Sequence, residues 1–133
     1  MKKIEHIGIA VKDLTAANKI YTALLNAVPY KEEAVASENV ITSFFACGES
    51  KIELLQATAP ESAIAKYIDK KGEGIHHIAF AVDNILEEVD RLKNEGFQPI
   101  SEQPKLGADN KLVFFFHPKS TNGVLIELCQ ENY

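Results

Sequence analysis

The chain has little cysteine, no surplus of positive charge and no long apolar run. Its two cysteines, Cys47 and Cys129, lie in apolar, strand-like segments rather than in a spaced framework. We therefore expect neither a disulfide scaffold nor a structural zinc knuckle. The net charge of −5 argues against nucleic acid or an anionic membrane surface as the main partner.

No segment reaches the length that a membrane-spanning helix requires. The opening MKKIEHIGIAV has the pattern of a strand and is too short and too polar for a secretory signal peptide. The sequence therefore predicts a cytoplasmic protein. With 46% hydrophobic and 25% charged residues, its 133 residues suit one folded domain, or two half-size modules that share a core.

The chain contains an internal repeat. HIGIAV at 6–11 returns as HIAFAV at 77–82, an offset of 71 residues, and each copy leads to a helix N-cap residue, Asp13 or Asn84, and then to an apolar helical period. KIELLQ at 51–56 likewise returns as LIELCQ at 125–130, an offset of 74 that a loop insertion would produce. Two repeated motifs in the same order indicate a duplication.

Each half is predicted to contain a strand, a helix and further strands. The expected elements of the first half are 3–11, 13–27, 30–36, 39–47 and 51–56, and those of the second are 75–82, 84–95, 97–101, 111–117 and 123–130. This pattern predicts an α+β fold of two tandem βαβββ modules that form an open, cleft-shaped mixed sheet. We expect a single domain over 1–133, with module 1 at about 1–58, a linker helix at about 60–73 and module 2 at about 74–133.

The repeated strands carry two histidines and two glutamates in equivalent places. His6 and His77 are each followed, on the same side of the strand, by glycine or alanine, which leaves open volume beside the imidazole. Glu53 and Glu127 are flanked by apolar residues that point the other way, so we expect both carboxylates to face the histidines' side. His76 has the opposite parity and is interpreted as structural or as a supporting residue.

Inward-facing carboxylates need compensation, because an unpaired buried carboxylate is costly and two together repel each other. A divalent cation supplies it, since two neutral imidazoles and two carboxylates give a 2+ ion nearly neutral surroundings. A single strand histidine is usually a core residue and a single strand glutamate usually faces solvent. The repetition in register favours the other interpretation, in which His6, Glu53, His77 and Glu127 are metal ligands.

The motifs EHIGIAVKDL, GIHHIAFAV and HPKSTNGVLIEL resemble those of the vicinal oxygen chelate superfamily, which has the glyoxalase-like fold, and within it those of the methylmalonyl-CoA epimerases. The resemblance covers nearly the whole chain. It implies that the same four residues bind the metal, that the ion is Co²⁺ or else Mn²⁺, Ni²⁺ or Zn²⁺, and that the protein is a homodimer.

The resemblance also implies a reaction, the interconversion of (2R)- and (2S)-methylmalonyl-CoA by 1,1-proton transfer at C2 through a metal-stabilised enolate. It gives Glu127 the role of a catalytic base. Some family members carry a second acid on the third strand of the first half. Here that strand reads VITSFFA, and its nearest counterpart, Thr42, cannot serve as a comparable base.

Coenzyme A requires positive charge or N–H donors. The segment between Pro104 and Gly123 has three lysines against one aspartate, a local excess of positive charge in an acidic protein. Lys105 and Lys111 are equally well explained as solubilising residues. The loop that leads to Glu127 is the stronger candidate, and its predicted substrate-binding residues are Lys119, Ser120, Thr121 and Asn122.

Two other functions fit parts of the pattern. A glyoxalase I-like lactoylglutathione lyase would use the same four-ligand metal and also move a proton, although PKLGADNK and HPKSTNG favour the epimerase. A non-catalytic small-molecule-binding member of the fold would typically lack a complete set of metal ligands. An extradiol dioxygenase uses two histidines and one carboxylate, so the fourth ligand argues against it.

Overall fold

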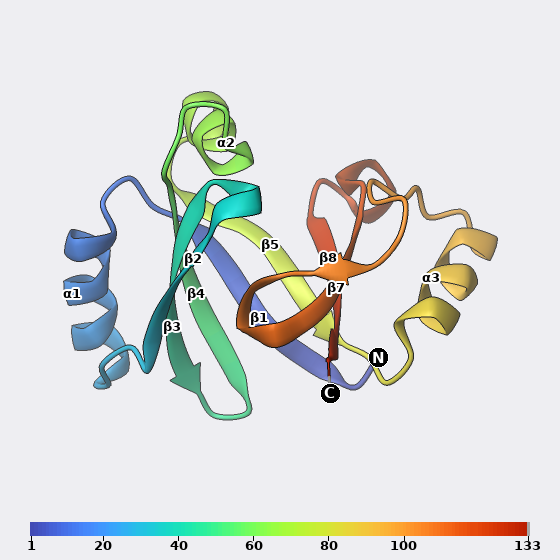
Figure 1. The fold of residues 1–133 in the computed structure, drawn as a ribbon, viewed down its shortest axis with the longest axis horizontal. Helices are drawn as coiled ribbons and strands as arrows, with labels where there is room; N and C mark the ends of the chain where they lie inside the picture. The colour runs from blue at the N-terminus through green and yellow to red at the C-terminus, as the bar shows by residue number, and fades with distance from the viewer. Residues whose placement is uncertain (133) are drawn as a thin grey trace. The chain divides into compact units, whose positions relative to one another are not determined.

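The computed structural model describes residues 1–132, which form two compact units (Figure 1). The first unit is His6–His76, and the second comprises Met1–Glu5 with the chain from His77 onward. In chain order the helices and strands are β1 (Lys3–Ala10), α1 (Leu14–Leu25), β2 (Lys31–Val35), β3 (Val40–Cys47), β4 (Ser50–Ala57), α2 (Ala63–Lys71), β5 (Gly74–Ala81), α3 (Ile85–Asn94), β6 (Lys105–Leu106), β7 (Lys111–Phe116) and β8 (Leu125–Glu131).

The first unit is a four-stranded mixed sheet with the strand order β2-β3-β4-β1. The pairs β2/β3 and β3/β4 are antiparallel, whereas β1 and β4 are parallel and are connected through α1 and the β2–β3 hairpin. Helix α1 packs against one face of the sheet, where Ile9 and Val11 join Phe45 and Leu54 in an apolar core. Helix α2 covers part of the opposite face through Ile64, which packs with the small core that includes Ala10, Val40 and Leu55.

The second unit repeats this topology with the strand order β5-β8-β7-β6. Its parallel pair is β5/β8, and β8/β7 and β7/β6 are antiparallel. Helix α3 packs against β7 and β8, where Val89 and Leu92 meet Phe114, Phe116 and Leu128. The matching strand order confirms the predicted α+β fold with its tandem βαβββ modules.

Both sheet helices begin in the same way, as the repeat predicts. The side-chain oxygen of Asp13 accepts a hydrogen bond from the backbone N–H three residues on in α1, at 3.2 Å. Asn84 does the same for α3, at 3.1 Å. Such caps satisfy one of the N–H groups that the first turn of a helix leaves without a partner.

A second acceptor at each helix start was not foreseen from the sequence. The side chain of Gln56, the last residue of KIELLQ, accepts a hydrogen bond from the N–H of Leu14 at 2.6 Å. Gln130, the last residue of LIELCQ, accepts one from the N–H of Ile85 at 2.7 Å. The glutamine that ends each repeated motif therefore ties the parallel strand to the start of the helix that packs on its sheet.

The predicted strand at 97–101 is wrong. Only an isolated bridge joins Pro99 to Phe116, and the edge strand is instead the two-residue β6. Proline has no N–H to donate to a ladder, so a regular strand is interrupted there. The segment is held to β7 irregularly, with the Ile100 N–H donating to the carbonyl of Phe115 at 2.9 Å and the Ser101 hydroxyl accepting from the Phe115 N–H at 3.0 Å.

The apolar period of α1 is wider than its buried face. Leu14 and Ala17 are buried, whereas Ile20 is 63% and Leu24 is 69% exposed, so the helical pattern at these two positions does not mark core residues. Among residues 1–132, no helix combines the length and apolar character that crossing a bilayer requires.

Candidate active site

The first unit brings His6 and Glu53 together. His6 lies on β1 and Glu53 on β4, and 3.0 Å separates the imidazole Nδ1 from the carboxylate Oε2. The residue of β1 in register with Glu53 is Gly8, which has no side chain to occupy the space beside the carboxylate. The two side chains are only 5% and 6% exposed, so the pair lies largely out of contact with water.

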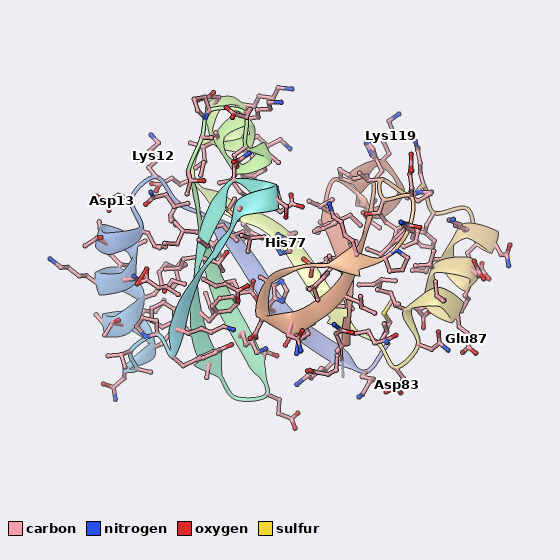
Figure 2. The ribbon with its side chains drawn as sticks, viewed as in Figure 1. Lys12, Asp13, His77, Asp83, Glu87 and Lys119 are labelled. Carbon is pink, nitrogen blue, oxygen red and sulfur yellow. The ribbon has the colours of Figure 1, made fainter. Side chains whose placement is uncertain are left out.

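The second unit forms the equivalent pair from His77 on β5 and Glu127 on β8. Here 3.1 Å separates the imidazole Nε2 from the carboxylate Oε1, and both residues are buried. Ala79 stands in register with Glu127, as Gly8 does with Glu53. The ring of Phe115 meets the His77 imidazole edge-on, with the ring centroids 6.1 Å apart. This contact restricts the plane of the imidazole. Figure 2 labels His77.

The donor atoms of these pairs suit a divalent metal ion. Each pair combines an imidazole nitrogen with a carboxylate oxygen, which are the ligand types that Co²⁺, Mn²⁺, Ni²⁺ and Zn²⁺ share. A buried carboxylate requires a compensating positive charge, and a neutral imidazole does not provide one. A bound cation provides it while both imidazoles stay neutral, so the side chains that the sequence selected fit the metal that the resemblance implies.

The structure adds an acidic residue that sequence reasoning missed. Glu33 on β2 stands in register with Thr42 on β3, and the same face of the sheet carries Phe44 and its partner Glu53. Because cross-strand partners point to the same side, the carboxylates of Glu33 and Glu53 share one face of the first unit. The side chain of Glu33 is 34% exposed, so a ligand can reach it. Its carboxylate is also held by an ion pair with Lys31 on the same strand, at 3.2 Å.

Thr42 itself is a poor candidate for chemistry. It is 1% exposed, and its hydroxyl has no hydrogen-bond partner within the part of the chain that the structure describes. The acidic residue nearest in register is Glu33 on the neighbouring strand, directly opposite Thr42. The alternation of β2 would have identified Glu33, had the pairing of β2 with β3 been known in register.

The predicted substrate-binding loop is a 3₁₀ turn over Pro118–Thr121. Two of its hydroxyls hold the turn: Ser120 accepts a hydrogen bond from the Gln98 N–H at 3.0 Å, and Thr121 donates to the carbonyl of Val124. Asn122 ends the turn in the left-handed region, with φ of 58°. The exposed side chain of Lys119 extends outward from the turn (Figure 2).

His76 contacts the linker helix α2. Its ring meets that of Tyr67 on α2 edge-on, with the centroids 4.9 Å apart. The hydroxyl of Tyr67 donates to the carbonyl of Ile75 at 2.6 Å, so the linker helix is fastened to the beginning of β5 at two adjacent residues. This contact accords with the structural or supporting role that the parity of His76 predicts.

Comparisons with a family model and with known proteins agree on one family. The model of the glyoxalase/bleomycin resistance protein/dioxygenase superfamily matches residues 5–115. An ethylmalonyl-CoA/methylmalonyl-CoA epimerase of Cereibacter sphaeroides is 40% identical over 130 residues, which cover 96% of this chain and 97% of that protein. The mitochondrial methylmalonyl-CoA epimerase of Homo sapiens is 39% identical over 129 residues, which cover 96% of this chain and 73% of that protein.

Solved structures extend the likeness to three dimensions. A methylmalonyl-CoA epimerase in complex with methylmalonyl-CoA and NH₄⁺ superimposes with a TM-score of 0.92 at 30% identity, covering 98% of this chain and 95% of that one. The fold is therefore the glyoxalase-like fold. The chain belongs to the glyoxalase/bleomycin resistance protein/dioxygenase superfamily and, within it, to the methylmalonyl-CoA epimerase family.

Proposed function

We propose that this protein is a metal-dependent epimerase that interconverts (2R)- and (2S)-methylmalonyl-CoA by 1,1-proton transfer at C2. The observation that carries the proposal is the pair of buried His–Glu contacts, at 3.0 and 3.1 Å, in equivalent places of two duplicated modules. Near full-length likeness to epimerases of the same substrate supports it. A binding module without catalysis would not require two such pairs.

We assign His6, Glu53, His77 and Glu127 as the ligands of one divalent ion, with Co²⁺ favoured and Mn²⁺, Ni²⁺ or Zn²⁺ suited to the same donors. When bound, the ion acts as a Lewis acid that stabilises the negative charge of the enolate as C2 loses its proton. The protein's own contribution is to hold the four donors in fixed positions. The strand pairing and the edge contact of Phe115 support that rigidity.

Epimerisation through two bases requires one carboxylate on each face of C2. Glu127 is assigned as the base in the second unit and Glu33 as the base in the first. One carboxylate takes the C2 proton and leaves the bonding electrons on the substrate as an enolate. The other, already protonated, returns a proton to the opposite face, which inverts the centre. A general base of this kind contributes about 10²–10⁴-fold to the rate.

The remaining parts of the proposal concern the cofactor half of the substrate and the assembly. Lys119, Ser120, Thr121 and Asn122 are assigned to the coenzyme A portion, because the turn presents an exposed ammonium in the loop that leads to Glu127. The hydroxyls that brace the turn support a preformed loop. A homodimer is proposed on the family resemblance.

The test is exchange of the C2 proton with solvent. Metal-loaded protein incubated with methylmalonyl-CoA in D₂O should place deuterium at C2, a chelator should abolish the exchange, and added Co²⁺ should restore it. A coupled assay with racemic methylmalonyl-CoA and the mutase should show conversion of the unreactive epimer. Absence of C2 exchange in metal-loaded protein, together with turnover of a glutathione hemithioacetal, would instead identify a lactoylglutathione lyase.

A further inference from the structure

A lysine on β2 is held at two points beside Glu33. The Lys31 ammonium lies 3.2 Å from the Glu33 carboxylate and 5.1 Å from the centroid of the Phe44 ring. Lys31 and Glu33 are two residues apart and so point to the same side of their strand, while Phe44 is the cross-strand partner of Lys31. The cation therefore sits at a place that the sheet register defines.

The aromatic surface under the cation is rigid. Phe44 is fully buried, and its ring packs at a tilt against that of Tyr30, with the centroids 5.8 Å apart. The backbone N–H of Tyr30 donates to the carbonyl of Phe44 at 2.8 Å, which fixes the two residues to each other. A cation over the face of such a ring is attracted by its quadrupole, so Phe44 limits where the flexible lysine side chain can go.

The duplication shows that this arrangement is not a requirement of the module. In the second unit the residue equivalent to Thr42 is Val113, and its partner on β6 is Lys105. The position that carries Glu33 in the first unit thus carries a lysine in the second. The Lys31–Glu33 pair is an addition to the shared architecture, which points to a role other than folding.

We propose that Lys31 is a positioning residue for Glu33, a role that rests on the proposed function of Glu33 as a base. A glutamate on an edge strand has several rotatable bonds, and proton transfer requires its carboxylate within a narrow range of positions. The ammonium, fixed over Phe44, holds that carboxylate in one orientation. Lys31 acts through Glu33 and is not itself an acceptor of the C2 proton.

The test compares Lys31→Met, which keeps the aliphatic stem but removes the charge, with Lys31→Arg, which keeps the charge. Lys19→Met, on the exposed side of α1, is the matched control. We expect Lys31→Met to lower kcat for epimerisation about tenfold with KM within about twofold, and Lys31→Arg to restore kcat to within about threefold. Metal content and the unfolding midpoint should match those of the parent.

A double-mutant cycle gives the decisive readout. If Lys31 acts through Glu33, Lys31→Met should have almost no further effect on kcat in a Glu33→Gln background. Equal losses of kcat in both backgrounds, or unchanged kcat in the single variant, would overturn the proposal. A raised KM at constant kcat would overturn it as well, by showing that Lys31 binds the substrate itself. Absence of C2 exchange in the parent protein would reject the proposed function separately.

Discussion

The imidazole of His77 supplies one donor of the proposed metal site and stands beside a second, Glu127. Replacing it by alanine removes a ligand and leaves a buried carboxylate without that imidazole, so His77→Ala should lose most of the divalent ion, about one per chain, that the purified parent holds. Elemental analysis measures this. His76→Ala, one residue away but packed on Tyr67, is the matched control and should keep its metal.

Glu33→Gln should lower kcat by about 10²-fold or more, since an amide of nearly the same volume cannot accept the C2 proton. Thr42→Ala removes a buried hydroxyl that lacks a hydrogen-bond partner among the described residues, and it should change kcat little. Steady-state rates with each epimer of methylmalonyl-CoA measure both effects. A loss with Thr42→Ala as large as that with Glu33→Gln would contradict the assignment of the second base.

Sequence alone selected some residues of the candidate site and missed others. The sequence predicts that the carboxylates of Glu53 and Glu127 face the histidines' side, because strand alternation and the internal repeat need no knowledge of which strands are neighbours. Glu33 was missed because its place depends on the register between β2 and β3, which local periodicity does not encode. The metal role of the four ligands remains a prediction, since it depends on an ion and not on the fold alone.

At the scale of elements, the helix starts are the places where the repeat has its clearest structural effect. Asn84→Ala should lower the free energy of unfolding by about 1 kcal/mol, because the first turn of α3 loses a side-chain acceptor. Urea denaturation of the metal-free protein measures the change. Asp83→Ala, whose exposed side chain contacts only Lys2 in the described ion pairs, should cost much less.

Element boundaries followed from the sequence wherever a long period or a cap marked them. The strand expected at 97–101 failed because Pro99 interrupts the ladder, and its replacement β6 is too short to have a period of its own. The apolar stripe of α1 is wider than the part of the helix that the sheet covers, so Ile20 and Leu24 on this stripe remain exposed. Helical periodicity identifies the helix, whereas the contact area of the sheet decides how much of the helix is buried.

At the scale of the whole molecule, the duplication predicts that both modules contribute ligands to one ion, and metal binding should therefore stabilise the entire chain. An ion at a hundred times its dissociation constant adds about 2.7 kcal/mol to the free energy of unfolding, which for a chain of this size raises Tm by about ten degrees. A chelator should lower the Tm of the parent by that amount. The control is the same titration on His76→Ala, which should behave as the parent does.

The two ligand variants distinguish one shared ion from two separate sites. His6→Ala removes a donor from the first unit and His77→Ala a donor from the second. If four residues bind a single ion, each variant alone should lose nearly all of the chelator-sensitive shift in Tm, because losing either histidine weakens the same binding equilibrium. If each module bound its own ion, each variant should retain about half of the bound metal and part of the shift. Calorimetry with elemental analysis on the same samples decides between these outcomes, and the second would remove the four-ligand centre on which the proposed proton transfer depends.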